Sequence, residues 1–272
     1  MSKLASNPIG IFDSGIGGLT VAYAVRKILP AEDIVYFGDT AHLPYGDKST
    51  AAIQAYSVKI CDVLLKQNCK VILIACNSAS SAANDLVKEY AGSKTKVFNV
   101  IDPVVDHLRE NFSDTKVGLI GTRQTINSNV YKKKIDALNE NISLSSLATP
   151  LLAPMIEEGF INNQVSQQII NEYLGSSVLD GIEALILGCT HYPLIKEQIE
   201  AYYNEKVKIL DSAEIVAKAL RAFLEFNNLL NNTNSTVPNS RFMVSDYTHS
   251  FEESTRFFFR ERVSLEKYPL WE

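Results

Sequence analysis

Short apolar runs alternate with helical patterns along this 272-residue chain. The segments Ile9–Phe12, Ile34–Phe37 and Val71–Ala75 contain no charged residue, and stretches with helical spacing of apolar positions separate them. Strands that are apolar on both faces are typical of parallel sheets covered by helices on both sides. The sequence therefore predicts an α/β fold built on a doubly wound parallel sheet.

The same layout begins again in the second half of the chain. Val117–Ile120 is followed by Gly121-Thr122-Arg123, as Ile9–Phe12 is followed by Asp13-Ser14-Gly15, and Ala184–Leu187 corresponds to Val71–Ile74. We therefore expect two similar doubly wound α/β lobes related by pseudo-symmetry. Ligands of parallel sheets bind at the carboxyl ends of the strands, so the active site is expected in the cleft between the lobes.

The last part of the chain is too short to form a domain of its own. A helix from Ser212, a polar loop over 228–239, a short strand at Arg241–Val244 and a further helix are expected to pack on the first lobe. The expected domains are residues 1–98 plus 211–272 for the first lobe and 99–210 for the second.

A cysteine follows a strand-like run in each half of the chain. Cys76 precedes Asn77 and Ser78, and Cys189 precedes Thr190 and His191. Two thiols in similar settings predict two opposed acid–base groups around one substrate, which is what inversion of a stereocentre requires. A following helix N-terminus or a nearby imidazolium lowers the pKa of a thiol, and we expect both cysteines to be activated in this way.

The other two cysteines and the histidines have plainer interpretations. Cys61 and Cys69 lie within and just after a predicted helix, and we interpret them as buried structural residues. His191 can donate a proton, assist Cys189 or hold a substrate carboxylate, whereas His42 is interpreted as a loop contact. The spacing of cysteines and histidines matches no zinc site, so no metal is expected.

The glycine-rich turn after the first run offers polar groups to a small ligand. The segment Asp13-Ser14-Gly15-Ile16-Gly17-Gly18 lacks both the dinucleotide fingerprint and the lysine of a phosphate-binding loop. It suits a zwitterion, whose ammonium can face Asp13 while Ser14 and backbone N–H groups hold its carboxylate. A tight turn that caps a helix is the alternative, and both interpretations can hold together.

Neutral hydrogen-bonding groups and one acidic pair complete the candidate site. Pro44-Tyr45-Gly46 and Asn77-Ser78 add donors that carry no charge. Glu157 and Glu158 precede Gly159 in what we interpret as a strand-to-helix connection. One of the two can point into the cleft, or both form a solvated helix start.

Composition limits the classes of partner. The net charge is −5 and the pI about 5.5, so no basic surface for nucleic acid is expected. No apolar run approaches the roughly 18 residues of a membrane helix, and no signal peptide is recognisable. Four cysteines without a disulfide-like pattern fit a reducing compartment, so a cytoplasmic location is expected.

Several motifs together resemble one family. The chain is similar to bacterial glutamate racemases, within the cofactor-independent aspartate/glutamate racemases, in the order and spacing of five strings. They are Ile11-Phe12-Asp13-Ser14-Gly15-Ile16-Gly17-Gly18-Leu19-Thr20-Val21, Phe37-Gly38-Asp39-Thr40, Pro44-Tyr45-Gly46, Ala75-Cys76-Asn77-Ser78 and Leu187-Gly188-Cys189-Thr190-His191-Tyr192-Pro193-Leu194.

The resemblance implies interconversion of L- and D-glutamate without pyridoxal phosphate or metal. It implies that Cys76 takes the proton from D-glutamate and Cys189 from L-glutamate, with Asp13 and His191 assisting them. The substrate contacts that it implies are Asp13, Ser14, Tyr45, Gly46, Asn77, Ser78, Thr190 and His191.

The family resemblance also carries expectations about the protein in the cell. It implies supply of D-glutamate for peptidoglycan synthesis in the cytoplasm, and a homodimer. Ser78 replaces the threonine usual in the family, which keeps the hydroxyl and removes a methyl group. The chain lacks the N-terminal extension of members activated by a cell-wall precursor, so that regulation is not expected.

Two other functions stay open on the residues alone. An aspartate racemase would share the same layout, because spacing does not determine the chain length of the substrate. A non-catalytic module that binds a small molecule on this scaffold would need no paired thiols, and alkylation of its cysteines would leave binding intact.

Overall fold

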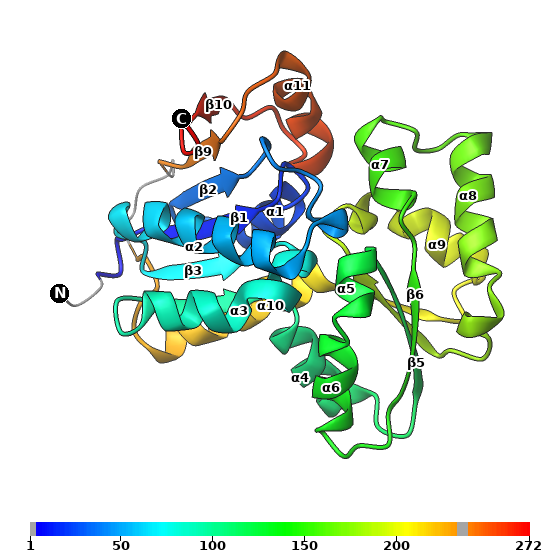
Figure 1. Ribbon diagram of the computed structural model, residues 1–272. Coiled ribbons are helices and arrows are strands. Elements are labelled where there is room, and N and C mark those ends of the chain that lie inside the picture. The colour runs from blue at the N-terminus through cyan, green and yellow to red at the C-terminus, as the bar shows by residue number, and fades with distance from the viewer. Residues whose placement is uncertain (1–3, 233–238) are drawn as a thin grey trace.

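Two separate parallel sheets lie side by side in the computed structural model, which describes residues 4–232 and 239–272 (Figure 1). Of the polar loop expected over 228–239, residues 233–238 lie outside the described part, as do residues 1–3. Within the described ranges, no helix combines the length and apolar character needed to cross a bilayer.

The first sheet has six strands in the order β10-β9-β2-β1-β3-β4, and every pairing is parallel. The strands are β1 (Ile9–Asp13), β2 (Ile34–Gly38), β3 (Val71–Ile74), β4 (Lys96–Asn99), β9 (Arg241–Val244) and β10 (Leu265–Lys267). The three central strands β1, β2 and β3 are buried at every position, as their apolar sequences predict. The last part of the chain extends this sheet, because β9 pairs with β2 and β10 pairs with β9. The sequence did not predict the strand β10.

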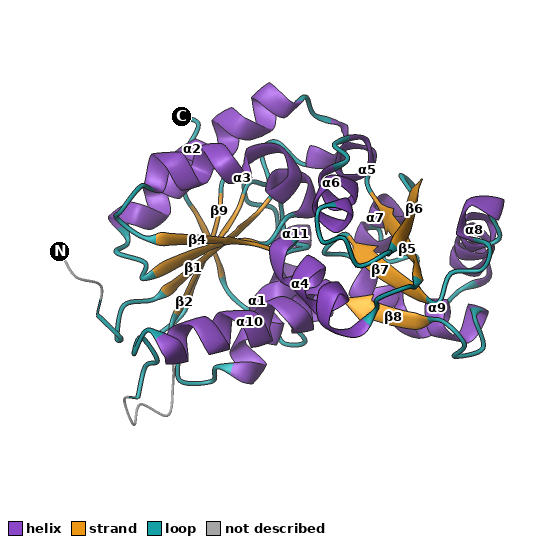
Figure 2. Cartoon of the chain, turned by 90° about the horizontal axis from the view of Figure 1, so that it is seen from below, coloured by secondary structure: helices purple, strands orange, loops and turns teal. Residues whose placement is uncertain are grey.

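Helices cover both faces of the first sheet. Helices α2 (Thr50–Lys66) and α3 (Asn77–Ala91) lie on one face, and α1 (Leu19–Ile28) and α10 (Ser212–Phe226) lie on the other (Figure 2). Ser49 caps α2 by accepting a hydrogen bond from the Ala52 N–H, and the Cys76 sulfur takes the same position at α3. Helix α11 (His249–Phe258) packs beside α1. A 3₁₀ turn, η1 (Tyr45–Asp47), precedes α2.

The second sheet has four strands in the order β6-β5-β7-β8, again all parallel. The strands are β5 (Lys116–Gly121), β6 (Ser143–Ala148), β7 (Ala184–Gly188) and β8 (Lys208–Asp211). Its helices and 3₁₀ turns are α4 (Asp102–Asn111), α5 (Arg123–Asn127), α6 (Val130–Asp136), α7 (Leu152–Glu157), α8 (Gln164–Leu174), η2 (Ser177–Leu179), η3 (Tyr192–Ile195) and α9 (Lys196–Tyr202). Apolar side chains of α4 and α6 pack on one face, and those of α7, α8 and α9 on the other.

The two sheets share a strand order. If strands are counted within each lobe, both sheets contain the order second, first, third, fourth. The predicted α/β class with two parallel sheets is confirmed. We propose that the shared order reflects the expected pseudo-symmetry, and that residues 1–98 plus 211–272 and residues 99–210 are the two domains.

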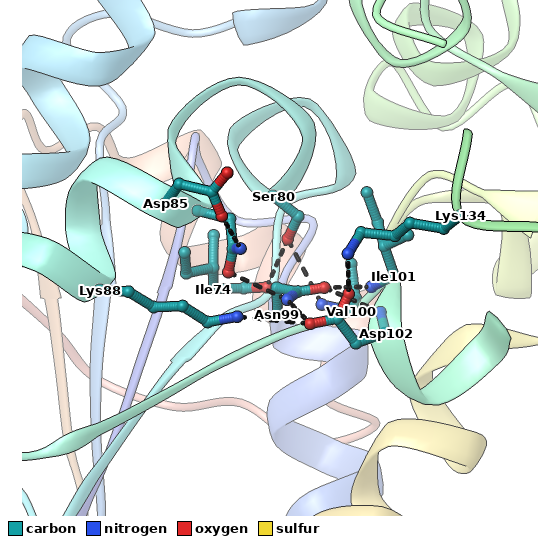
Figure 3. A network of polar contacts seen from close by, with 10 residues as sticks. Ile74, Ser80, Asp85, Lys88, Asn99, Val100, Ile101, Asp102 and Lys134 are labelled. Atoms are coloured by element: carbon teal, nitrogen blue, oxygen red, sulfur yellow. Dashed lines mark hydrogen bonds and ion pairs between the residues drawn. The ribbon is translucent and has the colours of Figure 1, made fainter. Parts of the chain in front are cut away.

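A polar network holds the first crossover between the sheets (Figure 3). The Asn99 side chain accepts hydrogen bonds from the N–H groups of Ile101 and Asp102 at the start of α4. The Asp102 carboxylate lies 2.9 Å from Lys134 Nζ on α6 and 3.4 Å from Lys88 Nζ on α3. One carboxylate thus joins a helix of the first lobe to a helix of the second.

Candidate active site

The two thiols singled out in the sequence face one pocket between the lobes. Cys76 ends the loop after β3 and caps α3, and Cys189 directly follows β7. Both are 6% exposed. The pocket is lined by Ser14, Pro44, Tyr45, Gly46, Cys76, Asn77, Ser78, Thr122, Ala153, Pro154, Glu157, Gly188, Cys189, Thr190 and His191.

Cys76 is buried beside a carboxyl group, and both burial and that group favour its protonated form. Its sulfur contacts Ser14 Oγ at 3.7 Å and accepts the Ala79 N–H at 3.4 Å. Burial, and then the charge of Asp13, raise the pKa of Cys76 to about 12. The expected lowering by the helix N-terminus is therefore wrong for this thiol, because desolvation outweighs the single N–H contact.

Asp13 is completely buried beside this thiol. Its Oδ2 accepts the Gly15 N–H at 3.1 Å, whereas Oδ1 has no hydrogen-bond partner among the described residues. Burial raises the pKa of Asp13, although His191 and the backbone N–H groups of Gly18 and Gly15 oppose the rise. A buried carboxyl with one unused oxygen is suited to exchange a proton with its surroundings.

Cys189 lies beside a histidine–glutamate pair. Its sulfur is 3.5 Å from His191 Nδ1, and His191 Nε2 is 2.8 Å from Glu157 Oε1. Burial alone would lower the pKa of His191, but the Cys189 sulfur and the Glu157 carboxylate raise it well above 6.5. These partners favour the protonated ring, and an imidazolium stabilises a neighbouring thiolate.

The element after Cys189 differs from the prediction. The N–H of Tyr192 donates to the Cys189 carbonyl as the chain enters η3, and α9 begins only at Lys196. Cys189 therefore has no α-helix N-terminus next to it, and the imidazolium is the cationic group at this thiol. Helix α7 ends at Glu157, so the alternative of a solvated helix start at the acidic pair is wrong. The other alternative agrees with the structure, because Glu157 lines the pocket while Glu158 is exposed.

The glycine-rich turn lets the two lobes approach at the site. A Cβ added to Gly17 would lie 2.3 Å from the ring of His191 and 2.8 Å from Thr190 Oγ1. Thr20 Oγ1 donates to the Thr190 carbonyl at 2.8 Å. The turn after β1 thus supports the segment that carries Cys189.

Neutral polar groups of the first lobe that line the pocket are held by residues of the second lobe. The Tyr131 hydroxyl donates to Asn77 Oδ1 at 2.9 Å, which leaves the buried Asn77 Nδ2 without a partner in the described residues. Ser78 Oγ lies 2.9 Å from Thr122 Oγ1 of the second lobe. An unpaired buried amide N–H2 is costly, so a bound acceptor such as a carboxylate would satisfy it.

Sequence reasoning missed some of these residues. Thr122 directly follows β5, the first strand of the second lobe, and Asp13 lies at the end of β1, the first strand of the first lobe. The repeated layout of the two halves could therefore have predicted that Thr122 reaches the site. Ala153 and Pro154 on α7 carried no chemical signal, and Tyr131 is distant in sequence from every motif. The expected contact residues line the pocket except Asp13, which is fully buried outside the lining.

A larger cavity of about 330 Å³ lies elsewhere between the lobes, against α1, α10 and Phe258. All four cysteines of the chain lie outside its lining. The smaller pocket holds both thiols with their acid–base partners, so we assign the chemistry to it.

Comparison with known proteins identifies the family. The family model described as Asp/Glu/Hydantoin racemase matches residues 20–220. The chain belongs to this racemase family. A glutamate racemase of Chlorobaculum parvum is 41% identical over 257 residues, which cover 94% of each chain.

Solved structures agree with this membership. A glutamate racemase of Francisella tularensis in complex with D-glutamate has a TM-score of 0.91 and 41% identity, covering 98% of this chain and 99% of the other. One from Bacillus anthracis has a TM-score of 0.90 and 33% identity, covering 96% and 97%. The expected resemblance to glutamate racemases is confirmed, and this member of the family is an amino-acid racemase.

Proposed function

We propose that the chain interconverts L- and D-glutamate by transfer of the α-proton between two cysteines. The observation that carries the proposal is the pair of thiols, one from each lobe, facing one pocket with separate acid–base partners. The glutamate racemases to which the chain is similar, one of them in complex with D-glutamate, support the substrate.

The groups beside the two thiols suit the direction from L to D. The Cys189 thiolate, beside the imidazolium of His191, takes the α-proton of L-glutamate. The electron pair left on the α-carbon is delocalised into the carboxylate. The Cys76 thiol then donates its proton to the opposite face, which leaves Cys76 as thiolate and Cys189 as thiol.

The reverse reaction exchanges these roles. Cys76 thiolate takes the α-proton of D-glutamate, and Cys189 supplies the proton to the other face. After each turnover the two cysteines exchange protons with solvent, Cys76 beside Asp13 and Cys189 beside His191, so that each thiol regains its starting state. No pyridoxal phosphate or metal is required in this scheme.

The α-proton of an amino acid is far less acidic than a thiol, so the site must stabilise the developing charge. The candidate donors to the substrate carboxylates and polar groups are Ser14, Gly46, Asn77, Ser78, Thr190 and His191, and Tyr45 lines the same pocket while its hydroxyl donates to Asp39. Asp13 lies outside the pocket lining, and we propose that the ammonium group of glutamate faces it when the substrate binds. Donors held in place in a pocket shielded from water stabilise such charge strongly.

The proposed function has consequences for the location, pathway and oligomeric state of the protein. We infer a cytoplasmic enzyme that supplies D-glutamate to peptidoglycan synthesis and acts as a homodimer. Its partners are then L- and D-glutamate, with neither nucleic acid nor membrane among them.

The test is incubation of the protein with L-glutamate in D2O, followed by circular dichroism and α-proton NMR. Loss of optical activity together with entry of deuterium at the α-carbon is expected without added cofactor. Cys76→Ala and Cys189→Ala should each reduce racemisation by roughly 10³-fold or more. Near-normal turnover in either variant would contradict the two-base scheme.

A matched control uses another buried cysteine. Cys61 is fully buried in α2, away from the pocket, so Cys61→Ala should retain racemisation. Activity with aspartate but not glutamate would contradict the proposed substrate, and binding of glutamate without exchange by the wild type would favour a binding module.

A further inference from the structure

We propose that Trp271 is a positioning residue for the substrate pocket, acting through Asp39 on Tyr45. Trp271 follows β10 and lies outside every motif discussed above. The inference rests on the proposed function, because it concerns the wall of the same pocket. It assigns a role to a segment far along the chain from the thiols.

The first step is the environment of Asp39. This carboxylate follows β2 and is completely buried. Its Oδ1 accepts hydrogen bonds from Trp271 Nε1 and Ser245 Oγ, each at 2.7 Å. Its Oδ2 accepts the Tyr45 hydroxyl at 2.6 Å. A buried carboxylate held by several donors fixes the position of each of them.

His42 completes the cluster and links it to α2. Its Nδ1 lies 3.1 Å from Asp39 Oδ2, and its ring stacks on Tyr56 with centroids 4.1 Å apart. Trp271 meets the His42 ring edge-on at 4.5 Å, and Lys59 Nζ lies 4.7 Å from the centroid of the indole. Aromatic and cation–π contacts of this kind orient the indole as well as bury it.

The second step leads from Asp39 to the pocket. Tyr45 is 1% exposed and lines the pocket beside Gly46. A Cβ on Gly46 would lie 2.9 Å from Thr122 Cβ, so this segment touches the second lobe directly. Leu43 packs against Gly15 of the turn that carries Ser14. A shift of the Tyr45 hydroxyl therefore moves one wall of the substrate pocket.

The third step is the connection along the chain. Ser245 follows β9 and Trp271 follows β10, so two donors to Asp39 come from the edge of the sheet added by the last part of the chain. The reacting thiols lie outside this cluster. Loss of the indole donor should therefore weaken substrate binding more than it slows the chemical step.

The main test is Trp271→Phe, which keeps an aromatic ring and removes the N–H donor. We expect KM for L-glutamate to rise roughly tenfold, the size of one lost hydrogen bond to a charged group, with kcat little changed. Tyr268→Phe is the matched control, because Tyr268 lies in the same segment and packs on Phe37 through its ring. Wild-type KM in Trp271→Phe would overturn the proposal.

A double-mutant cycle separates positioning from simple support of the fold. If Trp271 acts through Asp39 on Tyr45, the effects of Trp271→Phe and Tyr45→Phe on KM are not additive. Additive effects would mean that the two residues act separately, which contradicts the proposal.

Trp271 also provides a readout that needs no substrate, because it is the only tryptophan in the sequence. Tyr45→Phe removes a donor from Asp39 and should change the emission of Trp271 in the native state, whereas Tyr202→Phe should not. Unchanged emission in Tyr45→Phe contradicts the linkage. A wild-type protein inactive on both enantiomers of glutamate contradicts only the proposed function, so the two failures are distinguishable.

Discussion

The two thiols occupy equivalent places after β3 and β7 but have different acid–base partners. Cys76 has a buried carboxyl next to it, and Cys189 has an imidazolium held by Glu157. Burial and Asp13 favour the thiol form of Cys76, whereas the protonated form of His191 is favoured beside Cys189. Unlike partners of this kind suit the proposed transfer of a proton between two bases, of which one starts protonated and the other deprotonated.

Glu157→Gln tests the role of the glutamate at the residue scale. The carboxylate of Glu157 helps to raise the pKa of His191, so the amide should lower it. The imidazolium is then lost at a lower pH, and the high-pH limb of kcat/KM for L-glutamate should move to lower pH. Each unit of movement corresponds to about a tenfold change in the protonation ratio.

The control for this prediction is the neighbouring residue. Glu158 is exposed and outside the pocket, so Glu158→Gln should keep the wild-type pH profile. Identical profiles for the two variants would show that Glu157 does not act on His191.

At the scale of elements, the N-terminus of α4 holds a carboxylate where the helix dipole favours it. Lys134 and Lys88 come from α6 and α3, so Asp102 joins three helices of two lobes (Figure 3). Burial alone would raise the pKa of Asp102, but Lys134 and Asn99 outweigh it and the pKa is lowered. The carboxylate form is therefore the stabilising one.

Asp102→Asn should lower the free energy of unfolding at pH 7 by about 1 kcal/mol, since the side chain is partly exposed and its ion pairs are screened. The pKa of Asp102 in the folded protein is lower than its value of 3.8 in the unfolded chain. The carboxylate therefore stabilises the fold fully above pH 3.8, and this contribution disappears as the pH falls through the lower, folded-state pKa. The difference from wild type, measured by urea unfolding, should therefore vanish in acid.

Asp106→Asn on the same helix is the control, because Asp106 pairs only with Arg109 at an exposed position among the described contacts. It should change stability little at any pH. A difference for Asp102→Asn that persists in acid would exclude the charge as its cause.

At the scale of the whole molecule, the two lobes are closed on the pocket. Its cavity volume is about 40 Å³, against about 330 Å³ for the cavity beside α1 and α10. Contacts such as Ser78 with Thr122 and Arg123 with Asp47 join the lobes at its edge. An amino acid therefore needs the lobes to part, or pocket side chains to move, before it binds.

Gly46→Ala should interfere with this closure. The added methyl group would lie 2.9 Å from Thr122 Cβ, closer than carbon atoms pack. The lobes would then close less fully, and kcat/KM for glutamate should fall by at least about tenfold, since misplacement of about 1 Å is costly to catalysis. Thermal unfolding should show that the variant still folds. Normal kcat/KM would mean that the lobes do not need this contact.

Local sequence patterns predicted the central strands of both sheets, β9, the helices of the first lobe and the position of the two thiols after strands. Continuous apolar runs and helical periodicity are local properties, and polar residues after strands must gather at one edge of a parallel sheet. The same logic placed Ser14, Tyr45, Asn77, Ser78 and Thr190 at the pocket. The sequence also indicated that the last part of the chain packs on the first lobe.

Only the tertiary structure decided how burial and side chains from distant parts of the chain act on the site. Burial raised the pKa of Cys76 against the local expectation, because desolvation depends on everything packed around the sulfur. Glu157 reaches His191, Tyr131 reaches Asn77, and Trp271 reaches Asp39 from distant positions in the chain. Such contacts arise from the packing of separate elements, which local periodicity and motif spacing do not encode.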